Sequence, residues 1–173
     1  MDVKVQPQIR GDFKDTIKYK DGTVEVREGH NLIVNGIFNI ITSLLANKGG
    51  YQGLQYWAVG EGISSWNSSA PPDPSETDTQ LVKEIGRKAL QTGDFTWVNE
   101  RGENSVTPTN RLKVRTTFGY NDCVGTWREF GLFGGNATTS ANSGMLINHK
   151  NHGVIVKTTE MEIDREIIFT FTK

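Results

Sequence analysis

The sequence predicts a mainly β protein, an antiparallel and jelly-roll-like β-sandwich with one packed α-helix near residues 32–46. Three observations predict this class. Apolar and polar residues alternate with a period of two through most of the C-terminal half. Clusters of Gly, Asn, Asp and Pro bound the alternating segments. A helical period is clear in one place only, without a βαβ rhythm, an internal repeat or a heptad, so a single β domain is expected.

The chain has 173 residues, which suits one domain of ordinary size. Residues 1–11 carry Pro7 and Gly11 and show no strong periodicity, so we expect an extended N-terminal arm there and one β-sandwich domain over residues 12–173. A domain of this length buries roughly 70% of the surface that its unfolded chain exposes. It therefore needs neither a disulfide nor a metal to fold, and the single cysteine, Cys123, is expected to be a small buried apolar residue.

A hairpin is the first predicted element. Alternating apolar residues flank Asp21-Gly22, and this dipeptide supplies the two positive-φ positions that a type I′ turn needs. The next element is the helix, because apolar residues then recur at three- and four-residue steps. We expect Asn31 or Asn35 to cap it and Gly49-Gly50 to end it. Its apolar stripe consists of Val34, Ile37, Phe38, Ile41, Leu44 and Leu45.

A buried strand is predicted at residues 55–60, followed by a polar loop at residues 61–79 that either binds a partner or is disordered, and by a helical turn at residues 79–84. Later strands are predicted at residues 87–98, 110–120, 126–133, 145–148, 154–159 and 162–172. Both faces of residues 127–133 carry large apolar groups, with Trp127, Glu129, Gly131 and Phe133 on one of them. We expect a central strand covered on both sides, in which Gly131 marks a bulge or a close backbone.

Charged residues also alternate. The basic residues Arg111, Lys113 and Arg115 share one face of their strand, and the acidic residues Glu160, Glu162, Asp164 and Glu166 share one face of the last strand. We expect the acidic ladder to face solvent or to partner the basic ladder across the sheet. Arg165 is the one exception on the apolar side of the last strand.

The spacing of reactive residues predicts no catalytic, cofactor or metal site. His149 and His152 bracket Lys150-Asn151, a predicted turn, and no Cys or carboxylate stands beside them at ligand spacing. Gly60-Glu-Gly62 and Gly134-Gly135 lack the residues that follow a phosphate-binding loop. No nucleophile, base and orienting group can be placed together. We therefore expect a protein that is not an enzyme.

Charge and hydropathy exclude two classes of partner. The formal net charge is −1, with the basic residues spread along the chain, so no nucleic acid is expected. The longest apolar stretch, residues 32–46, is too short and too polar to span a bilayer, so no membrane is expected. Because the N-terminus has no apolar signal region, we expect a protein that is made in a cytoplasm and stays soluble until it assembles.

The order of motifs is a further observation. His30-Asn-Leu-Ile-Val-Asn35 precedes Tyr56-Trp-Ala-Val-Gly-Glu-Gly62, and the later motifs are Thr77-Asp-Thr-Gln-Leu-Val-Lys-Glu84, Gly125-Thr-Trp-Arg-Glu-Phe-Gly-Leu-Phe-Gly134, Gly144-Met-Leu-Ile147 and Ile168-Phe-Thr-Phe171. Over residues 30–171 this succession resembles small tail and appendage proteins of tailed bacteriophages. These include the attachment domains of tail fibres and related baseplate, collar or decoration components.

The resemblance implies a structural protein of the virion, made in the cytoplasm of a host bacterium. It would form a homo-oligomer and contact other virion proteins of the tail, baseplate, portal or collar, or capsid. Fibre attachment domains usually continue into a shaft and a tip, whereas this sequence ends with the domain, so we expect a stand-alone component. The alternatives are a capsid-surface decoration protein and a carbohydrate-binding module that recognises a host glycan.

Candidate interface residues lie in the arm and in two polar loops. Trp66 is foremost among them, because it stands in a long polar loop and large aromatic side chains often anchor interfaces. The full set is Val3, Val5, Ile9, Trp66, Pro71, Pro72, Asn136 and Thr138.

Overall fold

The computed structural model describes residues 8–172. Strand residues make up 53% and helical residues 8%, which confirms the predicted mainly β class with a single α-helix. In chain order the elements are β1 (Gln8–Tyr19), β2 (Val24–Ile33), α1 (Gly36–Ala46), β3 (Gln52–Gly60), β4 (Glu84–Ala89), the 3-10 helix η1 (Thr92–Asp94), β5 (Phe95–Val98), β6 (Asn104–Ser105), β7 (Arg111–Phe118), β8 (Gly125–Gly135), β9 (Met145–Lys157) and β10 (Met161–Thr172).

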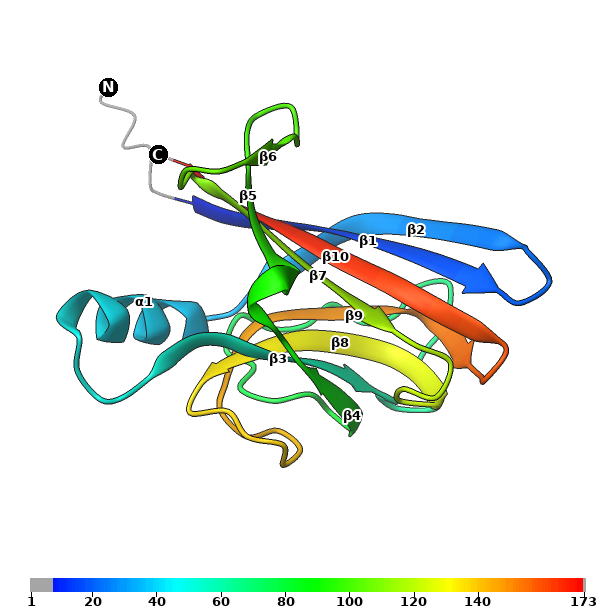
Figure 1. The fold of residues 1–173 in the computed structure, drawn as a ribbon. Coiled ribbons are helices and arrows are strands. Elements are labelled where there is room, and N and C mark those ends of the chain that lie inside the picture. Colours follow the sequence, from blue (N-terminus) through cyan, green and yellow to red (C-terminus); the bar gives the residue numbers. More distant parts are fainter. Residues whose placement is uncertain (1–7, 173) are drawn as a thin grey trace, which may run out of the picture.

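The ten strands form one antiparallel sheet in the order β4-β3-β8-β9-β2-β1-β10-β7-β5-β6. The sheet folds over on itself at β2. As a result an upper layer that contains β1, β10 and β7 lies over a lower layer that contains β9, β8 and β3 (Figure 1). Strand β2 pairs with β1 over residues 24–31 but with β9 only at Leu32 and Ile33. Helix α1 lies at one open end of this sandwich (Figure 1).

The hairpin between β1 and β2 is confirmed, but its turn differs from the predicted type. Gly22 has a φ of 90°, whereas Asp21 is not among the positive-φ residues of the described chain. The Tyr19 amide donates to the carbonyl of Thr23 at 2.9 Å and the Gly22 amide to that of Tyr19 at 3.0 Å. These bonds close a three-residue loop with glycine in the left-handed position, which needs one positive φ rather than the two of a type I′ turn.

The helix is shorter than predicted. Residues 32 and 33 pair with β9, and this pairing uses their apolar side chains in the sheet, so α1 begins at Gly36. Asn35 holds the N-cap position without a side-chain hydrogen bond. Asn47, with a φ of 49°, ends the helix in the left-handed conformation before Gly49-Gly50 is reached.

Two other local predictions are wrong. No turn separates residues 148 and 154, because Lys150 and Asn151 pair with Phe130 and Glu129 of β8 and keep β9 continuous. Residues 79–84 form no helical turn. The backbone amides of Val82 and Lys83, which a helix would use internally, donate to the Glu129 carboxylate instead.

Two apolar cores flank the lower layer, so β8 is covered on both faces, as predicted. The larger core, between the layers, includes Trp57, Phe118, Trp127, Phe130, Leu132 and Phe169. The smaller, on the outer face, consists of Val34, Ala58, Leu81, Phe133, Ala137 and Leu146. A bulge between Trp127 and Glu129 shifts the alternation, so Trp127 joins the larger core and its predicted grouping with Phe133 is wrong. A Cβ on Gly131 would lie 2.7 Å from the Asn148 carbonyl oxygen, which confirms the close backbone expected there.

Arg165, the predicted exception on the apolar face of β10, has a buried partner. Its Nε and Nη2 atoms each donate to a carboxylate oxygen of Asp15 at 2.6 Å. The guanidinium also lies over the ring of Phe130, 4.1 Å from its centroid. Both charged side chains are buried between the layers, where each offsets the charge of the other beside the buried His152.

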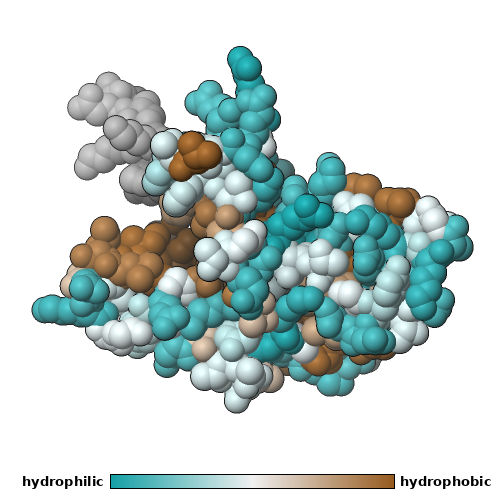
Figure 2. Space-filling model, viewed as in Figure 1, coloured by the Kyte–Doolittle hydropathy of each residue, from teal (hydrophilic) through white to brown (hydrophobic). Residues whose placement is uncertain are grey.

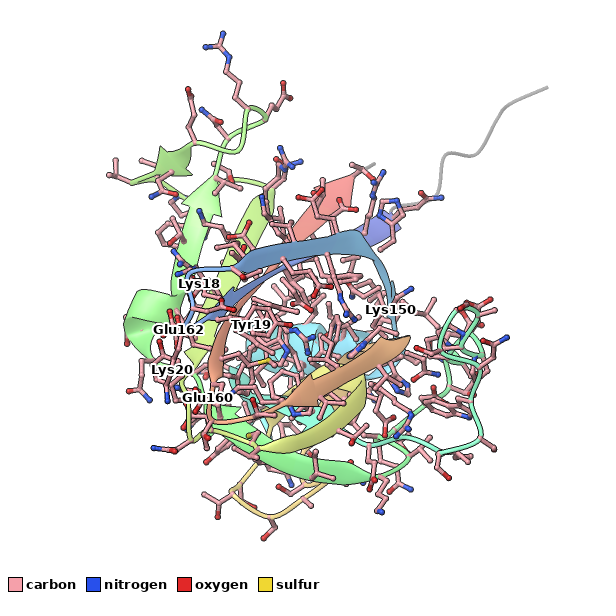
Figure 3. All side chains as sticks on the ribbon, turned by 90° about the vertical axis from the view of Figure 1, so that its right-hand side faces the viewer. Lys18, Tyr19, Lys20, Lys150, Glu160 and Glu162 are labelled. Carbon is pink, nitrogen blue, oxygen red and sulfur yellow. The ribbon has the colours of Figure 1, made fainter. Side chains whose placement is uncertain are left out.

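The opposite face of β10 carries the acidic ladder. Asp164 accepts hydrogen bonds from Arg115 of β7 at 2.9 Å and from Lys18 of β1 at 2.8 Å. Lys20 bonds Glu160 at 3.0 Å near the hairpin end of this face (Figure 3). The expected pairing with the basic ladder is thus confirmed for Arg115, and the lysines of β1 are a second set of partners.

We expect a variant that lacks one partner of the Asp15–Arg165 pair to lose more stability than a variant that lacks both. Asp15→Leu or Arg165→Met alone leaves a buried unpaired charge and should lower the free energy of unfolding by about 3–5 kcal/mol. The double variant should recover much of that loss. Urea unfolding of the four proteins measures the coupling, and losses that simply add would contradict it.

Candidate docking surface

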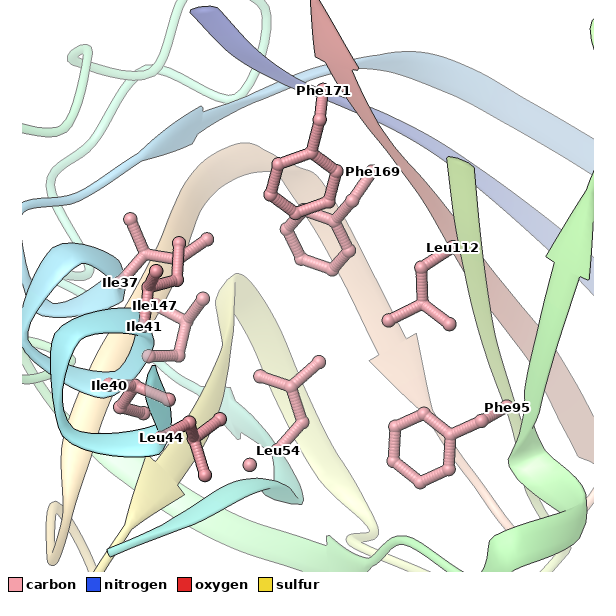
Figure 4. A pocket seen from close by; sticks show the side chains of 11 residues that line it. Ile37, Ile40, Ile41, Leu44, Leu54, Phe95, Leu112, Ile147, Phe169 and Phe171 are labelled. Carbon is pink, nitrogen blue, oxygen red and sulfur yellow. The ribbon is translucent and has the colours of Figure 1, made fainter. Parts of the chain in front are cut away.

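An apolar groove opens at the end of the sandwich where α1 lies (Figure 4). Its volume is about 420 Å³. Side chains from the helix, from both layers and from β5 meet there, and all of them are apolar. The lining residues are Ile37, Ile40, Ile41, Leu44, Gly53, Leu54, Phe95, Leu112, Ile147, Phe169 and Phe171.

The apolar stripe of α1 is wider than the sandwich covers. Ile37 and Ile40 are buried against the sheet. Phe38 and Leu45 lie outside the groove with 55% and 83% of their surface exposed. In Figure 2 apolar side chains gather on α1 beside a recess in the surface. Large exposed apolar patches are typical of surfaces that bind other molecules.

The described chain begins at the lip of this groove. Gln8 pairs with Thr172, and the next residue, Ile9, pairs with Phe171, which lines the groove. The predicted arm is therefore divided. Residues 8–11 belong to β1, with Ile9 packed against the larger core. Residues 1–7, including Val3 and Val5, lie outside the described part of the chain.

The other candidate interface residues lie away from the groove, and none of them lines it. Trp66 is partly buried, and its ring packs against Gly62, where an added Cβ would come 2.4 Å from the ring. The Pro72 carbonyl accepts a hydrogen bond from Asn151 of β9 at 2.9 Å. Asn136 and Thr138 are exposed, and the Arg87 side chain donates to the Thr138 carbonyl at 2.7 Å. Pro71, next to Pro72, is partly buried.

A buried carboxylate fixes the long loop that follows β3. Glu129 of β8 accepts hydrogen bonds from the backbone amides of Gly62, Val82 and Lys83, at 2.8–3.0 Å. These amides lie at the two ends of the loop, so one side chain holds both ends against the lower layer. Burial alone would raise the pKa of Glu129, but hydrogen bonds from His149, Lys83 and Val82 outweigh it and hold the pKa below its usual range.

His149 completes this network. Its Nε2 atom lies 3.1 Å from Glu129 and its Nδ1 atom 2.7 Å from Asp78. Both nitrogens are thus occupied, and neither is free to act as a general base. The sequence prediction placed His149 beside a turn and did not bring Glu129 and Asp78 together with it. The only local signal was a lone carboxylate within an apolar strand.

Burial also shifts the pKa values of two other titratable side chains. Burial, followed by the charge of Arg165, lowers the pKa of His152 to about 4. Burial, followed by the charge of Asp122, raises the pKa of Cys123 to about 11, so little thiolate forms near neutral pH. Among residues 8–172 no three His, Cys, Asp or Glu side chains gather into a metal site. The helices described fall short of the length and hydrophobicity that a membrane crossing requires.

Comparison of the chain with protein-family models, with curated proteins and with solved structures gave no match. The resemblance to phage tail and appendage proteins therefore remains a prediction from the motifs.

The Glu129 network predicts a loss of stability in acid. Because the pKa of Glu129 is lowered on folding, its stabilising effect is fully present above the usual value of 4.5 and is lost as the pH falls through the lower value. Glu129→Gln should lower the free energy of unfolding at pH 7 by about 3 kcal/mol. Below pH 4.5, the free energy of unfolding of this variant should change less with pH than that of the unmodified protein. Urea unfolding from pH 7 to pH 3 measures both effects, with the exposed Glu160→Gln as control. An unchanged slope in the Glu129 variant would contradict this role.

Proposed function

We propose that this protein is a non-enzymatic structural component of a tailed-bacteriophage particle. It assembles with copies of itself and with neighbouring virion proteins of the tail, baseplate, collar or fibre-attachment region. The observation that carries the proposal is the apolar groove together with the exposed face of α1, since the described residues leave both uncovered and their burial is favourable. The order of motifs over residues 30–171 supports the proposal that this particle is a tailed bacteriophage.

The occupant that we assign to the groove is the segment of residues 1–7 from a neighbouring copy. Seven extended residues span about 23 Å, which suffices to reach an adjacent chain. Gln8 pairs with Thr172, and Phe171 lines the groove, so this segment joins the described chain beside the surface that we assign to it. Val3 and Val5 stand two residues apart and share one side of an extended segment, while Asp2 and Lys4 share the other.

Such a contact joins different surfaces on the two copies. Contacts of this type close into a ring when the rotation permits and otherwise form a filament. Burial of one valine side chain stabilises a contact by roughly 1.5–3 kcal/mol, so a single arm in a single groove binds weakly. A ring in which each copy both gives and receives an arm adds these contributions together.

We expect Val3→Ser with Val5→Ser to reduce the assembled mass, because the groove loses its apolar occupant. Light scattering coupled to size-exclusion chromatography, over a range of concentrations, measures the mass. The groove variant Phe171→Ser should have the same effect, and thermal unfolding checks that each variant is folded.

Asp2→Ser with Lys4→Ser is the matched control, because it changes two side chains on the opposite side of the segment. It should assemble like the unmodified protein. Any truncation should remove residues 2–7 only, since Gln8–Gly11 belong to β1. An unchanged mass in the valine variant would overturn the assignment of the groove.

The virion role has a separate test. Particles sedimented from cultures of the source that encodes this chain should contain it in a fixed ratio to the other particle proteins, as measured by quantitative mass spectrometry. Recovery of the chain only from the fraction that does not sediment would contradict a structural role in the particle.

A further inference from the structure

Strand β2 has a long edge without a partner strand in the described part of the chain. It pairs with β9 at Leu32 and Ile33 only, and from Val24 to His30 its sole neighbour in the sheet is β1 (Figure 1). Val24 and Val26 are 57% and 51% exposed on this stretch. An unpaired strand edge of this kind is a template for pairing with another strand.

The hairpin determines which backbone groups this edge presents. The hydrogen bond from Tyr19 to Thr23 makes these residues a bonded pair, and such pairs recur at every second residue of an antiparallel ladder. Glu25, Arg27 and Gly29 therefore direct their amide and carbonyl groups toward β1. The amides and carbonyls of Val24, Val26 and Glu28 point away from β1. Where the chain after β2 meets β9, the even-numbered residue Val34 donates its amide to the Ile147 carbonyl. There too an even-numbered residue directs its amide away from β1.

The edge of β9 that faces β2 is covered by side chains and by a loop, unlike the edge of β2. The Val154 amide donates to the Ser68 hydroxyl at 3.0 Å, and Asn151 donates to the Pro72 carbonyl. The Arg27 side chain spans from β2 to the carbonyls of Gly153 and Val154, both at 3.2 Å. The loop after β3 and this arginine thus cover β9. Residues 24–30 of β2, by contrast, contain no proline, and their charged residues Glu25, Arg27 and Glu28 are of both signs.

The charges of β2 indicate that the strand which pairs with this edge is β2 of a second copy. In antiparallel self-pairing about a two-fold axis at Val26, Glu25 faces Arg27 of the second copy and Arg27 faces Glu25. An axis at Glu25 would place Glu25 opposite itself, an axis at Arg27 would do the same for Arg27, and an axis at Glu28 for Glu28. Like charges that face each other across strands are destabilising, and opposite charges are favourable. Glu25 and Arg27 already bond within one chain at 2.6 Å, so the axis at Val26 joins two such pairs into one alternating cluster.

We propose that two copies of this chain pair antiparallel through β2, about a two-fold axis at Val26, so that their upper layers join into one sheet. Val26 faces Val26 across the axis, and Val24 faces Glu28. The outward groups of these three residues supply about six backbone hydrogen bonds, two for each bonded pair. The pairing rests on the proposed function in that it names a contact between copies, but it uses a surface separate from the groove.

Disulfide cross-linking of single-cysteine variants tests both the contact and its register, with Cys123→Ser as the common background. Val26→Cys should cross-link to itself under mild oxidation, because bonded partners lie about 5.5 Å apart between Cα atoms, within disulfide range. Val24→Cys is the matched control. It is as exposed as Val26, but its counterpart on the second copy would lie roughly 14 Å away, four residues along the strand and one strand spacing across. A mixture of Val24→Cys with Glu28→Cys should cross-link, while each alone should not.

A charge exchange tests the selectivity of the pairing. In the Val26→Cys background, Glu25→Lys or Arg27→Glu alone should lower the cross-linked yield, with pairing weakened roughly tenfold or more, because like charges then face each other. A mixture of the two variants restores opposite charges at both positions and should restore the yield. Thermal unfolding confirms that each variant is folded.

Equal cross-linking of Val24→Cys and Val26→Cys would indicate random collision and would overturn the two-fold pairing. So would a Val26→Cys variant that stays monomeric on the non-reducing gel. In either case an assembled mass that still depends on Val3 and Val5 would leave the proposed function standing. A specific Val26 cross-link in a protein that is absent from particles would support the pairing and count against the virion role.

Discussion

The buried Asp15–Arg165 pair is the constraint on which the rest of the structure depends. An ion pair in an apolar core is stable only when both partners meet in good geometry, since either charge alone is costly to bury. The pair joins the inner faces of β1 and β10, and a shift of one residue between these strands would turn one of the two charges to the outer face and leave the other buried without its partner. Along β1, the backbone amides and carbonyls of alternate residues point toward β10 and those of the residues between them point toward β2. This alternation determines which residues of β2 direct their amides and carbonyls to its free edge.

Glu129 has the corresponding role on the outer side of the lower layer. A strand with large apolar groups on both faces needs a second cover, and the loop of residues 61–83 supplies it once Glu129 satisfies amides at both ends of the loop. Leu81 is fully buried as a result. Apolar surface stays exposed at several places in the described chain, among them the end of the sandwich beside α1 and the edge of β2. Both proposed contacts between copies lie where these two buried networks do not reach.

The sequence predicted best what short-range patterns determine. Alternation in residues 161–172 identified both faces of β10, and Gly131 identified a close backbone. The errors lie where distant residues override a local signal. Leu32 has a helical period with its successors but pairs with His149, and Lys150-Asn151 resembles a turn until Phe130 and Glu129 complete the ladder. Asp15 could not be matched to Arg165, 150 residues away, nor could Glu129 be matched to amides of a loop. The apolar groove could not be predicted from the sequence either. The residues that line it have the same pattern as core residues, and only the arrangement of the two layers distinguishes them.

The two proposed contacts differ in symmetry, and this difference constrains the assembly. Pairing through β2 is isologous, so on its own it stops at a dimer. The arm in the groove is heterologous, so it continues from copy to copy until it closes. A chain with both contacts builds either two rings face to face, joined through β2, or an extended lattice in which every edge is used. A ring of defined size that docks onto a particle requires the first outcome. The angle between the edge of β2 and the axis of the groove, which the register of β1 against β10 holds fixed, then decides between closure and continued growth.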